Sequence, residues 1–160
     1  MDKQACKSTS SAQWVDFLAR GGKLSELRQF DQNQLDAIYT VGHGRYSSGH
    51  YDEALKVFRY LCLLDHTSSR YFLGLGLAQA RLRLFAQAAA TLSHAEKLDS
   101  HDPRASLVMG ECFLELKQNV LAAQALSVAI RRAKAESRWK KELAKARQLA
   151  NYVGVNPGRG

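Results

Sequence analysis

The sequence predicts an all-α protein whose helices pair into a short solenoid. The first observation is a constant spacing, which we call the repeat interval, because Gly42 is as far from Gly76 as Gly76 is from Gly110. The same interval relates Ala54, Ala88 and Ala122, and also Phe58, Leu92 and Leu126. The second observation is the composition, because the chain has only two prolines and little alternation of β-branched residues. At 160 residues it is long enough for one domain with a core.

The repeat interval matches the tetratricopeptide repeat, which has a period of about 34 residues and in which each unit is a pair of antiparallel helices. We expect three such repeats, at residues 35–68, 69–102 and 103–130. The recurring glycines and alanines stand where the two helices of a pair cross, since only a small side chain allows close approach there. One pair cannot bury its own apolar face, so neighbouring pairs are expected to stack.

The turn residues agree with these helix pairs. Gly49 follows the first helix at a position that favours a positive φ. Asp102 and Pro103 are expected to open the third unit as N-cap and first helical residue. The pattern decays along the chain, because Arg83 and Lys117 replace the turn glycine in the later units.

The N-terminal part has two regions. Residues 1–11 are polar and are expected to be disordered. Residues 12–34 form a helical segment that Gly21 and Gly22 divide into two short helices. The first of these helices gathers three large apolar side chains, those of Trp14, Phe17 and Leu18. The segment is therefore expected to cap the solenoid or to form the contact of a homodimer.

The C-terminal part is basic. Residues 121–152 are predicted to be helical, and residues 131–160 form a basic helix and tail that cap the stack. This tail carries nine Lys/Arg against two Asp/Glu, whereas residues 35–130 carry nine of each. The spacing of basic residues around Trp139 is compatible with nucleic-acid binding. A charged helix face is more often simply solvated, so nucleic acid is not the expected partner.

The residue pattern gives no sign of catalysis. The five histidines form no i, i+4 pair and no Cys/His cluster, so no metal site is predicted. No Ser/His/Asp or Cys/His arrangement and no phosphate loop is visible, so we expect neither an enzyme nor a cofactor. Cys62 and Cys112 lie in stretches whose apolar residues recur with helical spacing, so we expect them to be buried like small apolar residues. With no apolar run of membrane-spanning length and no secretory signal, the sequence predicts a cytoplasmic protein.

The first helix of each unit is expected to line the concave face of the solenoid, with four outward positions per unit. These positions hold Asp36, Tyr39, His43 and Tyr46 in the first unit, Arg70, Leu73, Leu77 and Ala80 in the second, and Arg104, Leu107, Glu111 and Leu114 in the third. Because this face is unusually apolar for an exposed surface, it suggests a groove that binds an extended peptide through small apolar side chains. The alternative is that Leu73, Leu77 and Leu107 pack against the end helices as core.

The stretch YSSGHYDEALKVFRYLCLLDH, followed by RYFLGLG, resembles the class II chaperones of bacterial type III secretion systems, which serve hydrophobic translocator proteins. FLARGGKLSELRQF is similar to their N-terminal helical segment, and LDAIY to the start of their first repeat. The resemblance covers roughly residues 14–130. The basic tail departs from the family, whose members are usually acidic.

The resemblance implies an all-helical fold of three repeats, dimerisation through the N-terminal helices, and a concave groove. That groove binds a short, proline-flanked extended segment near the N-terminus of a translocator. Tyr39, Tyr46 and Tyr51 match the aromatic residues of the family groove, whereas His43 replaces an aromatic residue.

The predicted function is therefore a cytosolic chaperone that keeps hydrophobic translocators soluble until secretion. The alternative is a generic tetratricopeptide adaptor or transcriptional co-regulator. A nucleic-acid-binding protein acting through its basic tail is the third possibility.

Overall fold

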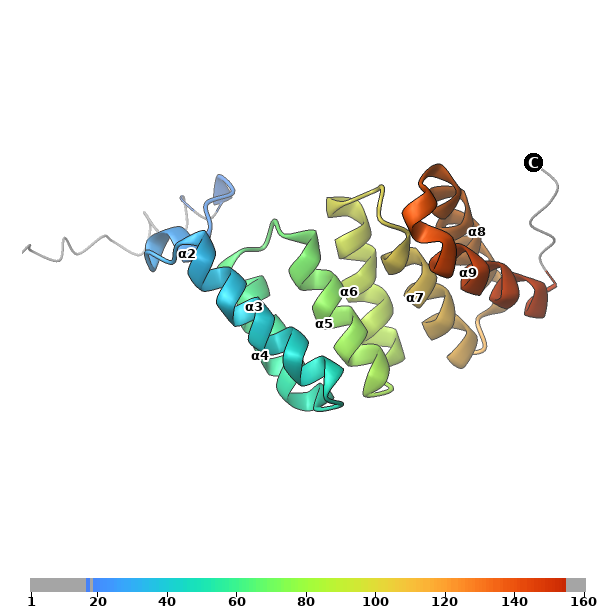
Figure 1. Ribbon diagram of the computed structural model, residues 1–160, viewed down its shortest axis with the longest axis horizontal. Coiled ribbons are helices and arrows are strands. Elements are labelled where there is room, and N and C mark those ends of the chain that lie inside the picture. The colour runs from blue at the N-terminus through green and yellow to red at the C-terminus, as the bar shows by residue number, and fades with distance from the viewer. Residues whose placement is uncertain (1–16, 18, 155–160) are drawn as a thin grey trace, which may run out of the picture.

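The computed structural model describes residues 17 and 19–154, and all regular structure among these residues is helical. The helices are α2 (Leu24–Leu27), α3 (Gln32–Ser47), α4 (Tyr51–Leu64), α5 (Ser69–Arg81), α6 (Phe85–Leu98), α7 (Pro103–Glu115), α8 (Asn119–Ala135), the 3₁₀ turn η1 (Ser137–Trp139) and α9 (Lys140–Tyr152). They follow one another along a short solenoid (Figure 1). No helix in the described part of the chain has the length and apolar character needed to span a membrane.

The helices α3 to α8 form three pairs, α3 with α4, α5 with α6, and α7 with α8, and each pair packs on the next (Figure 1). This arrangement confirms the predicted all-α solenoid of helix-turn-helix repeats. Three apolar clusters form the core. Phe58, Leu92 and Leu126, which recur at the repeat interval, belong one to each cluster and are almost fully buried.

The recurring glycines lie where the helices of a pair come closest. A Cβ atom added to Gly76 would lie 2.6 Å from Cγ of Leu92, and one added to Gly110 would lie 2.7 Å from Leu126. These separations are too short for two carbon atoms. The glycine in the first helix therefore makes room for the large residue of the second helix, as the repeat pattern predicts.

The turns also follow the sequence. Gly49 has φ +82°, and the residues that replace it in the next two turns, Arg83 and Lys117, have φ of +62° and +59°. Both non-glycine residues thus occupy the left-handed region, which costs about 1–2 kcal/mol per residue. Asp102 caps α7 by accepting a hydrogen bond from the backbone N–H of Arg104, and Pro103 is the first helical residue.

Residues 121–152, predicted to be helical, form two helices with a break between them rather than one continuous helix. The helix α8 ends at Ala135, Glu136 is extended, and η1 leads into α9. The break lets α9 fold back so that Ala146 and Ala150 are fully buried against α8. A continuous helix would carry this apolar stripe away from the core, and its burial favours the break.

The N-terminal segment is described only in part. Trp14 and Leu18 lie outside the described residues, as does the segment 1–11. The Phe17 side chain is partly buried and packs on Gly22, whose backbone N–H donates to the carbonyl of Phe17. Lys23, just before α2, pairs with Asp65 at the end of α4, with 2.9 Å between Nζ and Oδ2. This ion pair ties the segment to the first helix pair.

Candidate functional site

Three cavities open on the face formed by α3, α5, α7 and α9, which we call the groove. The tyrosine cavity, of about 90 Å³, is bordered by Tyr39, His43, Tyr46, Phe58, Leu73 and Leu77. The central cavity, of about 370 Å³, is bordered by Tyr46, Leu77, Ala80, Phe85, Val108 and Glu111. The end cavity, of about 220 Å³, is bordered by Leu77, Arg104, Leu107, Val108, Lys141, Glu142 and Lys145. Leu77 borders all three, so it lies at the middle of the groove.

Aromatic rings build the tyrosine cavity. The Tyr39 ring lies 5.7 Å from the ring of Phe58 and 6.0 Å from that of Tyr71, measured between centroids. The guanidinium carbon of Arg70 lies 4.2 Å from the Tyr39 centroid, a cation–π contact. Arg70 also pairs with Asp36 of the preceding repeat, and this hydrogen bond lowers the pKa of the Asp36 carboxyl. The Tyr39 ring is thus packed between the aromatic rings of Phe58 and Tyr71 and the guanidinium of Arg70.

A second aromatic contact joins α3 to α4. The rings of Tyr46 and Tyr51 meet edge to face at 5.4 Å, and the Arg81 guanidinium carbon lies 5.4 Å from the Tyr51 centroid. Burial raises the pKa of the Tyr46 phenol, so it stays neutral and can donate a hydrogen bond from the wall of the groove. Tyr51, the first residue of α4, supports Tyr46 from behind.

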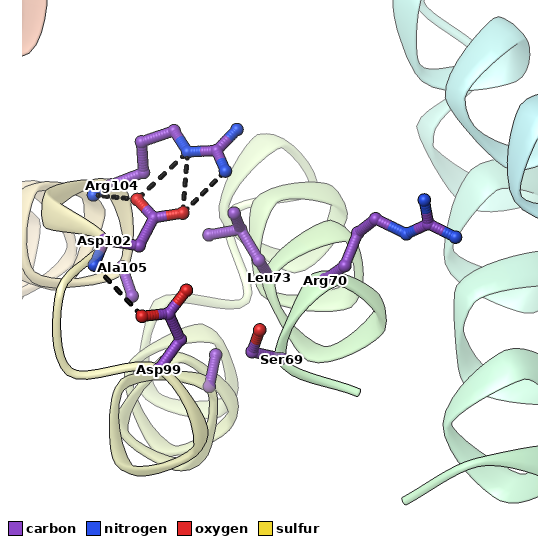
Figure 2. A pocket seen from close by; sticks show the side chains of 8 residues that line it. Ser69, Arg70, Leu73, Asp99, Asp102, Arg104 and Ala105 are labelled. Carbon is purple, nitrogen blue, oxygen red and sulfur yellow. Dashed lines mark hydrogen bonds and ion pairs between the residues drawn. The ribbon is translucent and has the colours of Figure 1, made fainter. Parts of the chain in front are cut away.

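Arg104 lies where the cavities meet. Its Nε donates to both carboxylate oxygens of Asp102 at 3.0 Å, and its Nη2 donates to Oδ2 at 2.5 Å (Figure 2). The hydrogen bond to Asp102 raises the pKa of Arg104. The same side chain borders a fourth cavity of about 160 Å³ at the edge of the groove, opposite Leu73 (Figure 2). Arg70 points away from this edge cavity in the same view.

The structure divides the predicted groove residues into two layers. Leu73 and Leu107 are only 7% and 4% exposed and belong to core clusters, so they form the floor of cavities rather than their walls. Leu77 and Ala80 are partly buried and border the groove cavities. Leu114 is also partly buried on α7. The alternative that Leu73, Leu77 and Leu107 pack as core therefore applies to Leu73 and Leu107 but not to Leu77.

Glu111, the remaining predicted residue, is already paired. Its Oε1 lies 2.5 Å from Nζ of Lys145 on α9. Sequence reasoning missed this contact because it placed no α9 residue in the groove. It also missed Phe85 and Val108, which border the central cavity. Phe85 lies one repeat interval after Tyr51, and each is the first residue of a second helix, so extending the interval from Tyr51 could have placed Phe85 in the groove.

The arrangement suits binding rather than covalent chemistry. Burial raises the pKa of Cys62 to about 12 and that of Cys112 to about 11, so both thiols stay protonated. Within the described residues, no group of His, Cys, Asp and Glu side chains is placed to hold a metal ion. An apolar floor with arginine and tyrosine donors above it matches an extended peptide, whose side chains need pockets and whose carbonyls need donors.

The basic residues after α7 are partly used within the fold. Arg132 pairs with Glu96 at 2.8 Å and donates to the buried hydroxyl of Ser106. Arg138 pairs with Glu136 at 2.8 Å, and Lys145 pairs with Glu111. These ion pairs engage three of the nine Lys/Arg in residues 131–160, so they account for only part of the charge that motivated the nucleic-acid hypothesis.

Known proteins similar to this chain belong to one family. The low calcium response locus protein H of Yersinia pestis is 34% identical over 113 residues, which are 71% of this chain and 67% of that protein. A type III secretion complex from Aeromonas hydrophila contains a chain with 32% identity and a TM-score of 0.87, covering 91% of this chain and 97% of that one. PcrH of Pseudomonas aeruginosa, solved with the chaperone-binding region of PopD, has 32% identity and a TM-score of 0.76, covering 78% and 94%.

No protein-family model matches the sequence. The curated relative and the solved structures nevertheless point to one family, and the solved structures share the helical fold described above. The chain belongs to the class II translocator chaperones of type III secretion systems.

Proposed function

We propose that the protein is a cytosolic chaperone that binds an extended segment of a hydrophobic translocator in its groove and keeps that translocator soluble before secretion. The position of Leu77 carries the proposal. It is partly buried and borders three cavities in succession, so one extended segment could place apolar anchors on both sides of it. The family relationship supports the same occupant, because PcrH was solved with the chaperone-binding region of PopD.

The groove supplies two kinds of contact. Apolar walls from Tyr39, Leu77 and Val108 remove anchor side chains from water, which favours binding by about 25 cal/mol per Å² of apolar area. Arg81 and Arg104 provide donors for the backbone carbonyls of a segment that has no strand partner. The segment loses conformational entropy as it binds, which keeps the affinity moderate and lets the client leave without ATP.

Occupying such a segment has a direct consequence for the client. A membrane-inserting protein exposes apolar surface in water and aggregates through it. A chaperone bound near one end blocks premature assembly while leaving the rest of the chain unfolded enough for export. We also propose a homodimer held by Trp14, Phe17 and Leu18. Removal of residues 1–30 then gives a folded monomer in light scattering, whereas a dimeric product would exclude this interface.

Co-expression tests the proposed function. A tagged form of this protein is expressed with a translocator such as PopD, and the soluble fraction is purified by the tag. The proposal predicts that the translocator stays soluble and co-purifies, and that it precipitates when expressed alone. A translocator that is equally insoluble with and without this protein contradicts the proposal.

A further inference from the structure

The repeat interval continues beyond the third repeat. One more interval after Gly110 leads to Ala144, and one more after Pro103 leads to Ser137, the first residue of η1. The turn η1 and the helix α9 together therefore occupy the place that α3, α5 and α7 occupy in their own repeats. The helix α9 packs on α8 and α7 as a further first helix would (Figure 1).

Continuing the repeat interval along α9 assigns its residues to two faces, one toward the place that a second helix would take and one toward the groove. Lys140 corresponds to Ile38, Phe72 and Ser106, which are buried or partly buried in their repeats. No second helix follows α9 among the described residues, and Lys140 is exposed. A charged residue at this position suits the polar outer face that ends a stack of repeats.

Lys141 and Lys145 fall at the groove positions of that register. Lys141 corresponds to Tyr39, Leu73 and Leu107, and Lys145 to His43, Leu77 and Glu111. The structure agrees with this correspondence, because both lysines border the end cavity, and Lys145 also borders the central cavity. The groove thus extends onto α9, where its walls change from tyrosine and leucine to lysine.

The end cavity combines an apolar floor with cationic donors. Leu107 forms its floor, Leu77 and Val108 are its apolar walls, and Glu142 lines it beside the lysines. Lys145 is engaged by Glu111, but Lys141 has no hydrogen-bond or ion-pair partner within the described residues. An ammonium group with three donors is therefore available directly beside an apolar pocket.

Arg104 offers a second donor at the same place. Asp102 engages its Nε and Nη2, whereas Nη1 has no hydrogen-bond acceptor in the part of the chain that the structure describes. The ring of Trp139, the last residue of η1, lies 5.3 Å from the Arg104 guanidinium carbon and limits its movement. Figure 2 shows the carboxylate of Asp102 holding the guanidinium edge-on. The free nitrogen is thus oriented before any ligand arrives.

From this geometry we propose that α9 is the first helix of a fourth, incomplete repeat, and that its Lys141 forms, with Arg104, a client subsite at the end of the groove. The ligand of this subsite is an aliphatic side chain next to an oxygen acceptor in an extended segment. The acceptor is a main-chain carbonyl or an acidic side chain. The proposal rests on the proposed function, because it extends the same groove.

The test uses the full chain and the chaperone-binding peptide of PopD with its native flanking residues. The matched pair of variants is Lys141→Glu and Lys140→Glu, which change the net charge equally on neighbouring positions of one helix. A charge-assisted hydrogen bond is worth about 1.5–3 kcal/mol, so Lys141→Glu is expected to weaken peptide binding about tenfold or more. Lys140→Glu is expected to change it less than about twofold, because only the long-range field differs.

Two further experiments identify the hydrogen-bond acceptor in the peptide and locate the bound peptide on α9. Lys141→Gln keeps a donor without the charge, so it retains most of the affinity if the acceptor is a carbonyl and loses it if the acceptor is an acidic side chain. A photo-crosslinking amino acid in place of Lys141 is expected to capture the peptide, and the same group in place of Lys140 is not.

The outcomes separate this inference from the proposed function. One result excludes the subsite on α9 but leaves the proposed groove intact: the peptide binds the wild-type protein, and Lys141→Glu and Lys140→Glu weaken its binding equally. Equal capture of the peptide by the crosslinking groups in place of Lys141 and Lys140 leads to the same conclusion. If the peptide does not bind the wild-type protein at all, the proposed function fails and the subsite fails with it.

Discussion

Gly76 of α5 lies directly against Leu92 of α6, so closely that even a methyl group on the glycine would come within 2.6 Å of Leu92 Cγ. Leu92 is fully buried. The same pairing recurs between Gly110 and Leu126. These contacts set the distance between the helices of each pair, and hence the position of the groove residues that the first helices carry.

This contact makes Gly76→Ala destabilising. Forcing an extra carbon into a packed core costs about 1–3 kcal/mol, and the better helix propensity of alanine offsets only up to about 1 kcal/mol. The matched control is Gly44→Ala in α3, since a Cβ atom there meets nothing within 4 Å. Denaturant unfolding should show a lower free energy of unfolding for Gly76→Ala and a higher one for Gly44→Ala. Equal shifts would exclude the close contact as the cause.

The left-handed backbone at Lys117 gives a stabilising substitution. Lys117 has φ +59°, so Lys117→Gly should raise the free energy of unfolding by about 0.5–1 kcal/mol, the part of the strain that exceeds the entropy cost of glycine. Lys117→Ala keeps the Cβ atom and should bring no gain. Thermal unfolding of the three proteins measures this, and a gain with alanine as large as with glycine would exclude backbone strain as the explanation.

The partly buried Arg132 should contribute to the free energy of unfolding, whereas the neighbouring Arg131 should not. Arg132 is bonded to Glu96 and to Ser106, whose hydroxyl donates to the same carboxylate at 2.6 Å. Arg132→Met leaves these groups without their cation, and we expect a loss of about 2 kcal/mol in the free energy of unfolding. Arg131→Met, at an exposed position, should change it by less than about 0.5 kcal/mol. Equal losses would show that Arg132 acts through the net charge alone.

Asp65 should make the stability depend on pH in the acid range. Burial alone would raise the pKa of its carboxyl, but hydrogen bonds from Lys23 and Thr67 outweigh this and lower the pKa below its ordinary value. Because the folded-state pKa is the lower one, this stability is fully present above the unfolded pKa of about 3.9 and is lost as the pH falls through the folded value.

Asp65→Asn should therefore lower the melting temperature at pH 7, and the difference from the wild-type protein should shrink as the pH falls below about 4. Melting curves across that range measure it. A difference that stays constant down to pH 2 would mean that the carboxylate charge contributes nothing.

The helix pairs could be predicted from the sequence because their cause is local. A glycine that recurs at the repeat interval has one physical reason, the close approach to a large residue such as Leu92, and the structure shows that approach. Gly49 and Asp102 act as the turn and cap residues that their chemistry favours. These features need no knowledge of how distant segments meet.

The depth of the groove and the role of α9 depend on distant contacts. Leu73 and Leu77 are four residues apart on one helix face, yet Leu73 is buried in the core cluster that includes the third repeat, while Leu77 is partly buried and borders all three groove cavities. The break after Ala135 depends on burial of Ala146 and Ala150 against α8, which helical periodicity within residues 121–152 does not reveal. Extending the repeat interval to Ala144 was the one sequence signal that could have placed α9 in the groove.

The account depends most directly on Leu77 as the centre of a client-binding groove. The decisive measurement is calorimetric titration of the PopD chaperone-binding peptide into Leu77→Asp and into Leu63→Asp, a matched change at a position on α4 that is 63% exposed. Losing a central apolar anchor site costs about 2 kcal/mol or more, so Leu77→Asp should weaken binding at least tenfold while circular dichroism still shows the wild-type helix content. Leu63→Asp should bind like the wild-type protein. Normal binding by a folded Leu77→Asp variant would contradict the account, because the client would then occupy another surface.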